Sequence, residues 1–134
     1  MRFVLDASIT INWAMPDESH PTAELALREL SGESSAIVPG IWWYEVRNVL
    51  VLNERRKRIV SADSMKFLGD LQHFDIEVDN ALDSTAVLDL ARKHGRSVYD
   101  AAYLALAFRE RLPLATLDSA LQSAASAIGI SLLA

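Results

Sequence analysis

The sequence begins MRFVLDAS, and residues 2–6 of this stretch, RFVLD, decide the fold class. A short apolar run of strand-forming residues that ends on a carboxylate is typical of a buried strand that brings Asp6 to the edge of a sheet. Residues 112–118, LPLATLD, repeat the pattern near the other end of the chain and end on Asp118. Two such runs predict strands whose carboxyl ends place acidic side chains at one edge of a sheet.

Helices and strands are expected to alternate between and around these two runs. The apolar spacing and the helix-stop residues predict helices that begin at Ser8 and that cover residues 20–30, 41–55, 62–72, 81–95 and 97–111. They also predict strands over residues 35–40 and 74–78, and an edge strand over residues 127–134. The alternation favours a three-layer α/β/α sandwich with a central, mainly parallel sheet.

The bulk composition fits one globular domain over residues 1–134, because 51% hydrophobic residues supply a sizeable core. The absence of cysteine excludes disulfides and cysteine-based zinc sites, and the three histidines have no paired-ligand spacing. A net charge of -5 argues against broad, non-specific nucleic-acid binding. An acidic residue follows only a few apolar ones at the N-terminus, so we expect no signal peptide or membrane anchor and a cytoplasmic location.

Four carboxylates are candidates for a catalytic site. Asp6 and Asp118 follow the two strand-like runs, whereas Glu45 and Asp100 lie within otherwise apolar helical runs. A charge embedded in apolar sequence is expected to be paired or to ligate an ion. Simpler explanations stay open: the aspartates could be helix caps, with Ser97 capping the helix of Asp100, and Glu45 could form a salt bridge to Arg47 or Arg109.

Converging carboxylates would repel one another unless a cation neutralised them. Oxygen ligands without histidine or cysteine point to Mg²⁺ or Mn²⁺ rather than zinc. Such an ion suits phosphodiester hydrolysis, because it acidifies a bound water and stabilises the charge that develops on the phosphate oxygens. The number of ions does not follow from the sequence.

Four motifs, in this order and spacing, resemble the PIN-domain family and its VapC toxins over nearly the whole chain: VLDAS, a Glu in the helix after the second strand, SVYDAAYLALA and LATLD. The resemblance matches the family's acidic quartet to Asp6, Glu45, Asp100 and Asp118, with Asp6, Asp100 and Asp118 as metal ligands. Ser8 and Thr116 match the hydroxyl residues that accompany the first and last acids. It implies a Mg²⁺- or Mn²⁺-dependent endoribonuclease that acts as the toxin of a toxin-antitoxin system, forms a homodimer and is inhibited by a small VapB-like antitoxin.

Three other functions are weighed against this one. A phosphoacceptor receiver domain would need an acidic pair after the first strand and a late lysine, but VLDAS has a single Asp and the last lysine is Lys93. A non-catalytic PIN-like module that binds RNA or protein is the main alternative, since a fold does not dictate function. Cleavage of DNA or flaps would use the same metal chemistry, so the choice of RNA rests on the resemblance.

Two further groups of residues could serve binding. The run ERRKR, residues 54–58, could hold RNA phosphates, or could simply complement the dipole at the end of a helix. Trp42, Trp43 and Tyr44 are consecutive, so they cannot all face one core and at least one should be partly exposed. Exposed aromatic rings could stack on bases, but we favour a groove for an apolar partner helix such as an antitoxin tail.

Overall fold

Helices and strands alternate along the chain as predicted, and the computed structural model describes every residue from 1 to 134. In chain order the elements are β1 (Arg2–Leu5), α1 (Ala7–Ala14), α2 (Pro21–Ser31), β2 (Ser35–Pro39), α3 (Ile41–Arg55), α4 (Ser61–Leu71), β3 (Ile76–Asp79), α5 (Ser84–His94), α6 (Val98–Glu110), β4 (Leu114–Ala115) and α7 (Ser119–Ala127). None of the helices is both long enough and apolar enough to span a bilayer.

The sheet has four strands in the order β3-β2-β1-β4, and all three pairings are parallel. Phe3, Val4 and Leu5 have no exposed surface, because β1 lies between two strands and under helices. After β1 the chain continues to β2 on one side, while β4 pairs with β1 on the other. The carboxyl ends of β1 and β4 therefore meet where the strand order reverses, which is the usual place for a ligand site in an open parallel sheet.

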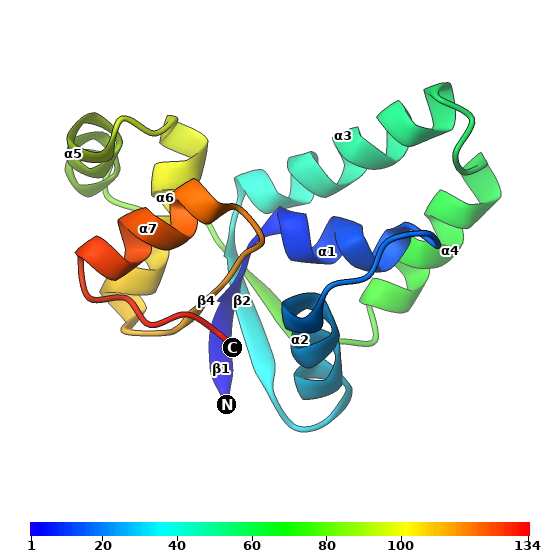
Figure 1. Ribbon diagram of the computed structural model, residues 1–134, viewed down its shortest axis with the longest axis horizontal. Coiled ribbons are helices and arrows are strands. Elements are labelled where there is room, and N and C mark those ends of the chain that lie inside the picture. Colours follow the sequence, from blue (N-terminus) through cyan, green and yellow to red (C-terminus); the bar gives the residue numbers. More distant parts are fainter.

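Helices cover both faces of the sheet, which confirms the predicted three-layer sandwich. Figure 1 shows α5, α6 and α7 on one side of the strands and α1 to α4 on the other. Tyr103 and Leu104 in the middle of α6 are fully buried, and the helix contacts both β1 and β2. Parallel strands need such cover, because neither of their faces can remain in water.

The end of the chain differs from the prediction in two respects. Residues 119–127 form α7, a helix that was not predicted, and residues 127–134 do not form an edge strand. Leu132 makes only an isolated parallel bridge to Leu114. The physical reason is that Leu121 and Ala125 bury one helical face of α7, and Gly129, at φ 81°, then turns the chain.

The first helix also begins one residue earlier than predicted. α1 starts at Ala7, with Asp6 in the N-cap position, rather than at Ser8. The Asp6 side chain makes no capping hydrogen bond. Its carboxylate is consequently available for contacts with residues from other elements.

Candidate active site

Asp6 is the most deeply buried carboxylate at the carboxyl edge of the sheet, with 8% of its surface exposed. Its Oδ2 accepts hydrogen bonds from the hydroxyls of Ser8 at 2.7 Å and Thr116 at 2.6 Å. Burial raises the pKa of Asp6 above the usual range; the two hydroxyls oppose this shift and nearby Asp100 adds to it. The hydroxyls thus partly replace the water that a buried carboxylate loses.

Glu45 lies in the second turn of α3 and reaches α6 rather than a cation. Its Oε1 accepts a 2.6 Å hydrogen bond from the hydroxyl of Tyr103. Burial raises the pKa of Glu45, and the negative charges of Asp6 and Asp100 raise it further. The predicted alternative of a salt bridge is wrong, because Arg109 pairs with Asp79 and Glu110 while Arg47 packs over the ring of Trp43.

Asp100 lies in the first turn of α6, which begins because Ser97 caps it. The Ser97 hydroxyl accepts a hydrogen bond from the backbone N–H of Asp100 at 3.1 Å, as the capping alternative predicts. The Asp100 side chain itself does not cap the helix. Its Oδ2 instead accepts a 2.7 Å hydrogen bond from Nη2 of Arg96.

Asp118 follows β4 and is the N-cap of α7. Its Oδ1 accepts hydrogen bonds from the backbone N–H groups of Ala120 at 2.9 Å and Leu121 at 3.2 Å. Its Oδ2 lies 3.3 Å from Nη2 of Arg96. The capping explanation for Asp118 is therefore correct, and its second oxygen also belongs to the acidic site.

The structure brings the four predicted residues to one end of the sheet, although they are not equivalent. Asp6, Glu45 and Asp100 line one cleft, together with Ser8 and Asn48. Asp118 does not line this cleft and is connected to Asp100 through Arg96. The cleft thus carries three carboxylates. Asp6 and Glu45 accept hydrogen bonds from hydroxyls and have no contact with a cation.

The donor chemistry of this cleft fits a hard divalent cation. In Asp6, Glu45 and Asp100 one carboxylate oxygen binds a protein donor, and the other accepts no side-chain hydrogen bond. Mg²⁺ and Mn²⁺ prefer such oxygen ligands, and Mg²⁺ keeps several waters while using few carboxylates. As the side chains stand, no three acidic or histidine side chains are close enough to ligate one ion together, so binding would require that side chains move or that waters bridge them to the ion.

Sequence reasoning missed two residues at this site, Tyr103 and Arg96. Tyr103 is fully buried in the apolar middle of α6, where a tyrosine is indistinguishable from an ordinary core residue in the sequence. Arg96 lies between Gly95, which ends α5 in the left-handed conformation, and Ser97, which caps α6. It follows the end of α5 by two residues, and three basic residues already occupy the last turn of that helix, so its sequence position does not distinguish it from them.

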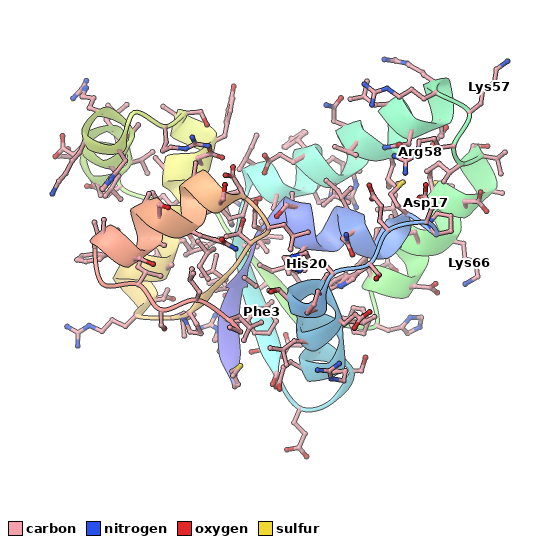
Figure 2. All side chains as sticks on the ribbon, in the orientation of Figure 1. Phe3, Asp17, His20, Lys57, Arg58 and Lys66 are labelled. Carbon is pink, nitrogen blue, oxygen red and sulfur yellow. The ribbon has the colours of Figure 1, made fainter.

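The basic run at the end of α3 lies away from the cleft. Figure 2 shows Lys57 at the outer tip of the α3–α4 connection and Arg58 beside Asp17. Arg58 forms a 2.8 Å ion pair with Asp17, so one of the four cations is already paired within the chain. The role of Arg55 and Arg56 in holding RNA stays a prediction.

The aromatic residues at the start of α3 divide as predicted. Trp42 is buried, whereas Trp43 and Tyr44 are 45% and 66% exposed. Tyr44 borders an apolar groove between the start of α3 and the start of α6. The groove residues are Pro39, Gly40, Ile41, Tyr44, Asp79, Asn80, Leu82, Val98, Tyr99 and Ala102.

The protein has a parallel sheet covered by helices on both faces, with an acidic cleft at the carboxyl edge of that sheet. A comparison with protein families identifies the class of protein that has this architecture. Residues 3–127 match the model of the PIN domain, and the chain belongs to the PIN-domain family. It is 32% identical over 121 residues to Ribonuclease VapC3 of Pyrobaculum aerophilum, an alignment that covers 88% of this chain and 90% of that protein. The resemblance to VapC proteins is thereby confirmed.

Solved structures agree with this assignment. The crystal structure of PAE2754 from Pyrobaculum aerophilum has a TM-score of 0.68 at 25% identity and covers 92% of this chain and 87% of its own. Two more distant structures share the fold. FitAcB from Neisseria gonorrhoeae has a TM-score of 0.66 at 17% identity and covers 100% of this chain and 97% of its own. Mycobacterium tuberculosis VapC20, a sarcin-ricin loop cleaving toxin, has a TM-score of 0.62 at 13% identity and covers 96% of this chain and 95% of its own.

Proposed function

We propose that this chain is a VapC-like endoribonuclease that hydrolyses RNA phosphodiester bonds with a carboxylate-bound Mg²⁺ or Mn²⁺. The observation that carries the proposal is the cleft lined by Asp6, Glu45 and Asp100 at the switch point of the sheet. The pKa values of Asp6 and Glu45, raised mainly by burial, support it, because both carboxylates are withdrawn from water and neither contacts a cation of the protein. The relationship to Ribonuclease VapC3 supports the choice of RNA as substrate.

Each residue has a role in this proposal. Asp6, Asp100 and Asp118 are the metal ligands, and Glu45 orients the attacking water and accepts its proton. A divalent cation, when bound, supplies the positive charge that acidifies water and neutralises the phosphate. Ser8 and Thr116 hold the Asp6 carboxylate in one orientation, and Tyr103 does the same for Glu45. Oriented carboxylates need not reorganise during the reaction, which is a main source of catalytic rate.

We further propose that the chain acts in the cytoplasm as a homodimeric toxin whose partner is a small VapB-like antitoxin. The groove beside Tyr44 is a candidate surface for an apolar antitoxin helix. Coexpression with the product of an adjacent short reading frame should yield a complex that withstands purification, and light scattering should give the mass of a dimer for the chain alone. A chain that is monomeric and binds no such product would contradict this part of the proposal.

The nuclease proposal is tested by incubating the purified chain with total cellular RNA in the presence of Mg²⁺, Mn²⁺ or a chelator, and by mapping new RNA ends. We expect discrete cleavage that requires the metal and disappears in Asp100→Asn. Asp89→Asn is the matched control, because Asp89 is exposed on α5 and has only a weak contact with Arg92. No cleavage by a folded, metal-loaded protein would favour the non-catalytic binding module.

A further inference from the structure

Arg96 is the only cation that contacts the acidic site, and it contacts two of its carboxylates with one nitrogen. Nη2 lies 2.7 Å from Oδ2 of Asp100 and 3.3 Å from Oδ2 of Asp118. The side chains of Arg96 and Asp100 are each 26% exposed and that of Asp118 is 37% exposed, so all three are accessible to ions. Arg96 thus provides positive charge next to two of the aspartates that are proposed to hold the metal.

The hydrogen bonds of the four carboxylates show what Arg96 controls. Asp6, Glu45 and Asp100 each keep an oxygen that accepts no side-chain hydrogen bond. Asp118 differs, because Oδ1 caps α7 by accepting from two backbone N–H groups and Oδ2 faces Arg96. Both oxygens of Asp118 therefore already have donors, whereas each of the other three carboxylates keeps one oxygen without a side-chain donor.

Arg96 is held less firmly than a guanidinium in a bidentate ion pair. Both of its ion pairs use Nη2, and its Nε is buried without a hydrogen-bond partner. An arginine that pairs through two parallel hydrogen bonds is more strongly fixed than one that pairs through a single nitrogen. Losing the contact with Asp118 would consequently cost little and would leave α7 capped.

We propose that Arg96 is a built-in counter-cation that competes with the divalent cation for Asp118. In the metal-free protein it neutralises Asp100 and Asp118 and keeps Asp118 out of the metal site. Arg96 would leave Asp118 when the ion is bound, because the two cations repel each other. Arg96 is thus a positioning residue that lowers the affinity of the site for metal. This inference rests on the proposed metal-dependent function.

The test compares the binding of Mn²⁺ alone to the full chain and its variants by titration calorimetry at low ionic strength. Arg96→Gln should lower the Kd about five- to tenfold, as expected for removing one partly exposed competing ion pair. Arg96→Lys keeps one charge but cannot form both contacts as arginine does, so its Kd should lie between the two. Arg92→Gln, a control on the exposed face of α5, should match the wild type.

Coupling to Asp118 distinguishes competition from a general effect of charge. In the Asp118→Asn background, Arg96→Gln should change the Kd clearly less than it does in the wild type. An unchanged or higher Kd in both Arg96 variants, with wild-type protein that binds Mn²⁺ and cleaves RNA, would overturn the role of Arg96 alone. If folded wild-type protein and every variant bind no Mn²⁺, the proposed function fails as well.

Discussion

The hydroxyl of Tyr103 donates a 2.6 Å hydrogen bond to Oε1 of Glu45 and so connects α6 to α3 across the acidic cleft. Tyr103 is completely buried, and burial raises its pKa far above the usual range. The negative charges of Asp6 and Glu45 raise this pKa further. The phenol therefore remains protonated and remains a donor at any pH at which the protein functions. It fixes the orientation of Glu45 without supplying a charge that would compete with a metal ion.

Removing this hydroxyl should affect both stability and the pH profile. Tyr103→Phe should lower the free energy of unfolding by about 1–2 kcal/mol, because the partly buried Glu45 loses its donor. The pKa of Glu45 should rise further, since this hydrogen bond lowers it, and the acidic limb of RNA cleavage should move to higher pH. Urea denaturation and a pH-rate profile measure the two effects.

Tyr99→Phe is the matched control for this variant, because Tyr99 is a tyrosine of the same helix that is 59% exposed, whereas Tyr103 is buried. Its free energy of unfolding should stay within about 0.5 kcal/mol of the wild type. Equal stability of Tyr103→Phe and the wild type would contradict the importance of the Tyr103–Glu45 bond.

Asp6→Asn should remove RNA cleavage but stabilise the metal-free protein near neutral pH. Because the folded-state pKa of Asp6 is raised, its protonated form contributes stability at low pH, and this contribution is lost as the pH rises through the folded-state pKa. Asparagine carries no charge, so it avoids this loss. The melting temperature without metal should therefore exceed that of the wild type at pH 7 and approach it at pH 4.

Added Mn²⁺ should reverse the order of stability, because a ligand that binds only the folded state stabilises it. The wild type should gain melting temperature with Mn²⁺ concentration, whereas Asp6→Asn should gain much less. If the variant is less stable than the wild type at pH 7 without metal, the buried charge of Asp6 does not destabilise the folded protein.

Thr116→Val tests the hydroxyl that contacts Asp6. Valine has nearly the same shape as threonine but cannot donate the 2.6 Å hydrogen bond to Oδ2. This bond lowers the pKa of Asp6, so its loss should raise that pKa further. Binding of Mn²⁺ should weaken and require a higher pH, as measured by titration at several pH values. Thr116→Ser retains the hydroxyl and should bind Mn²⁺ like the wild type; equally weak binding by both variants would point to packing instead.

Arg109→Gln tests an ion pair outside the active site with the opposite dependence on pH. The hydrogen bond from Arg109 holds the pKa of Asp79 below its usual range. A lowered pKa contributes stability above the unfolded-state pKa, and this contribution is lost as the pH falls through the folded-state value. The variant should lose up to about 1 kcal/mol at pH 7, as is usual for partly exposed pairs.

The difference between Arg109→Gln and the wild type should disappear once Asp79 is protonated, at a pH well below about 4. Denaturation at a series of pH values measures it, and high salt should reduce it at pH 7. A difference that stays constant down to the lowest pH would assign the loss to packing of the arginine side chain.

Much of the fold could be predicted because burial in a parallel sheet leaves a local pattern. RFVLD and LPLATLD each carry an apolar run and a terminal acid, so the sequence alone places Asp6 and Asp118 at the ends of β1 and β4. α7 was missed because two of its three buried residues are alanines, which mark an apolar helix face less clearly than larger side chains do. The prediction of an edge strand was wrong, because residues 127–134 pack their apolar side chains on the core and make only a single bridge to the sheet.

The sequence by itself determined the fold class and the family, and it named the four candidate carboxylates, because these depend on residue type and order along the chain. Only the tertiary structure decided how these carboxylates differ: Tyr103 orients Glu45, two hydroxyls hold Asp6, and Arg96 faces Asp118. The partners of three of these contacts are separated by 22 to 110 residues. Residues so far apart in the sequence come together only when the chain folds, so no local sequence pattern predicts these contacts.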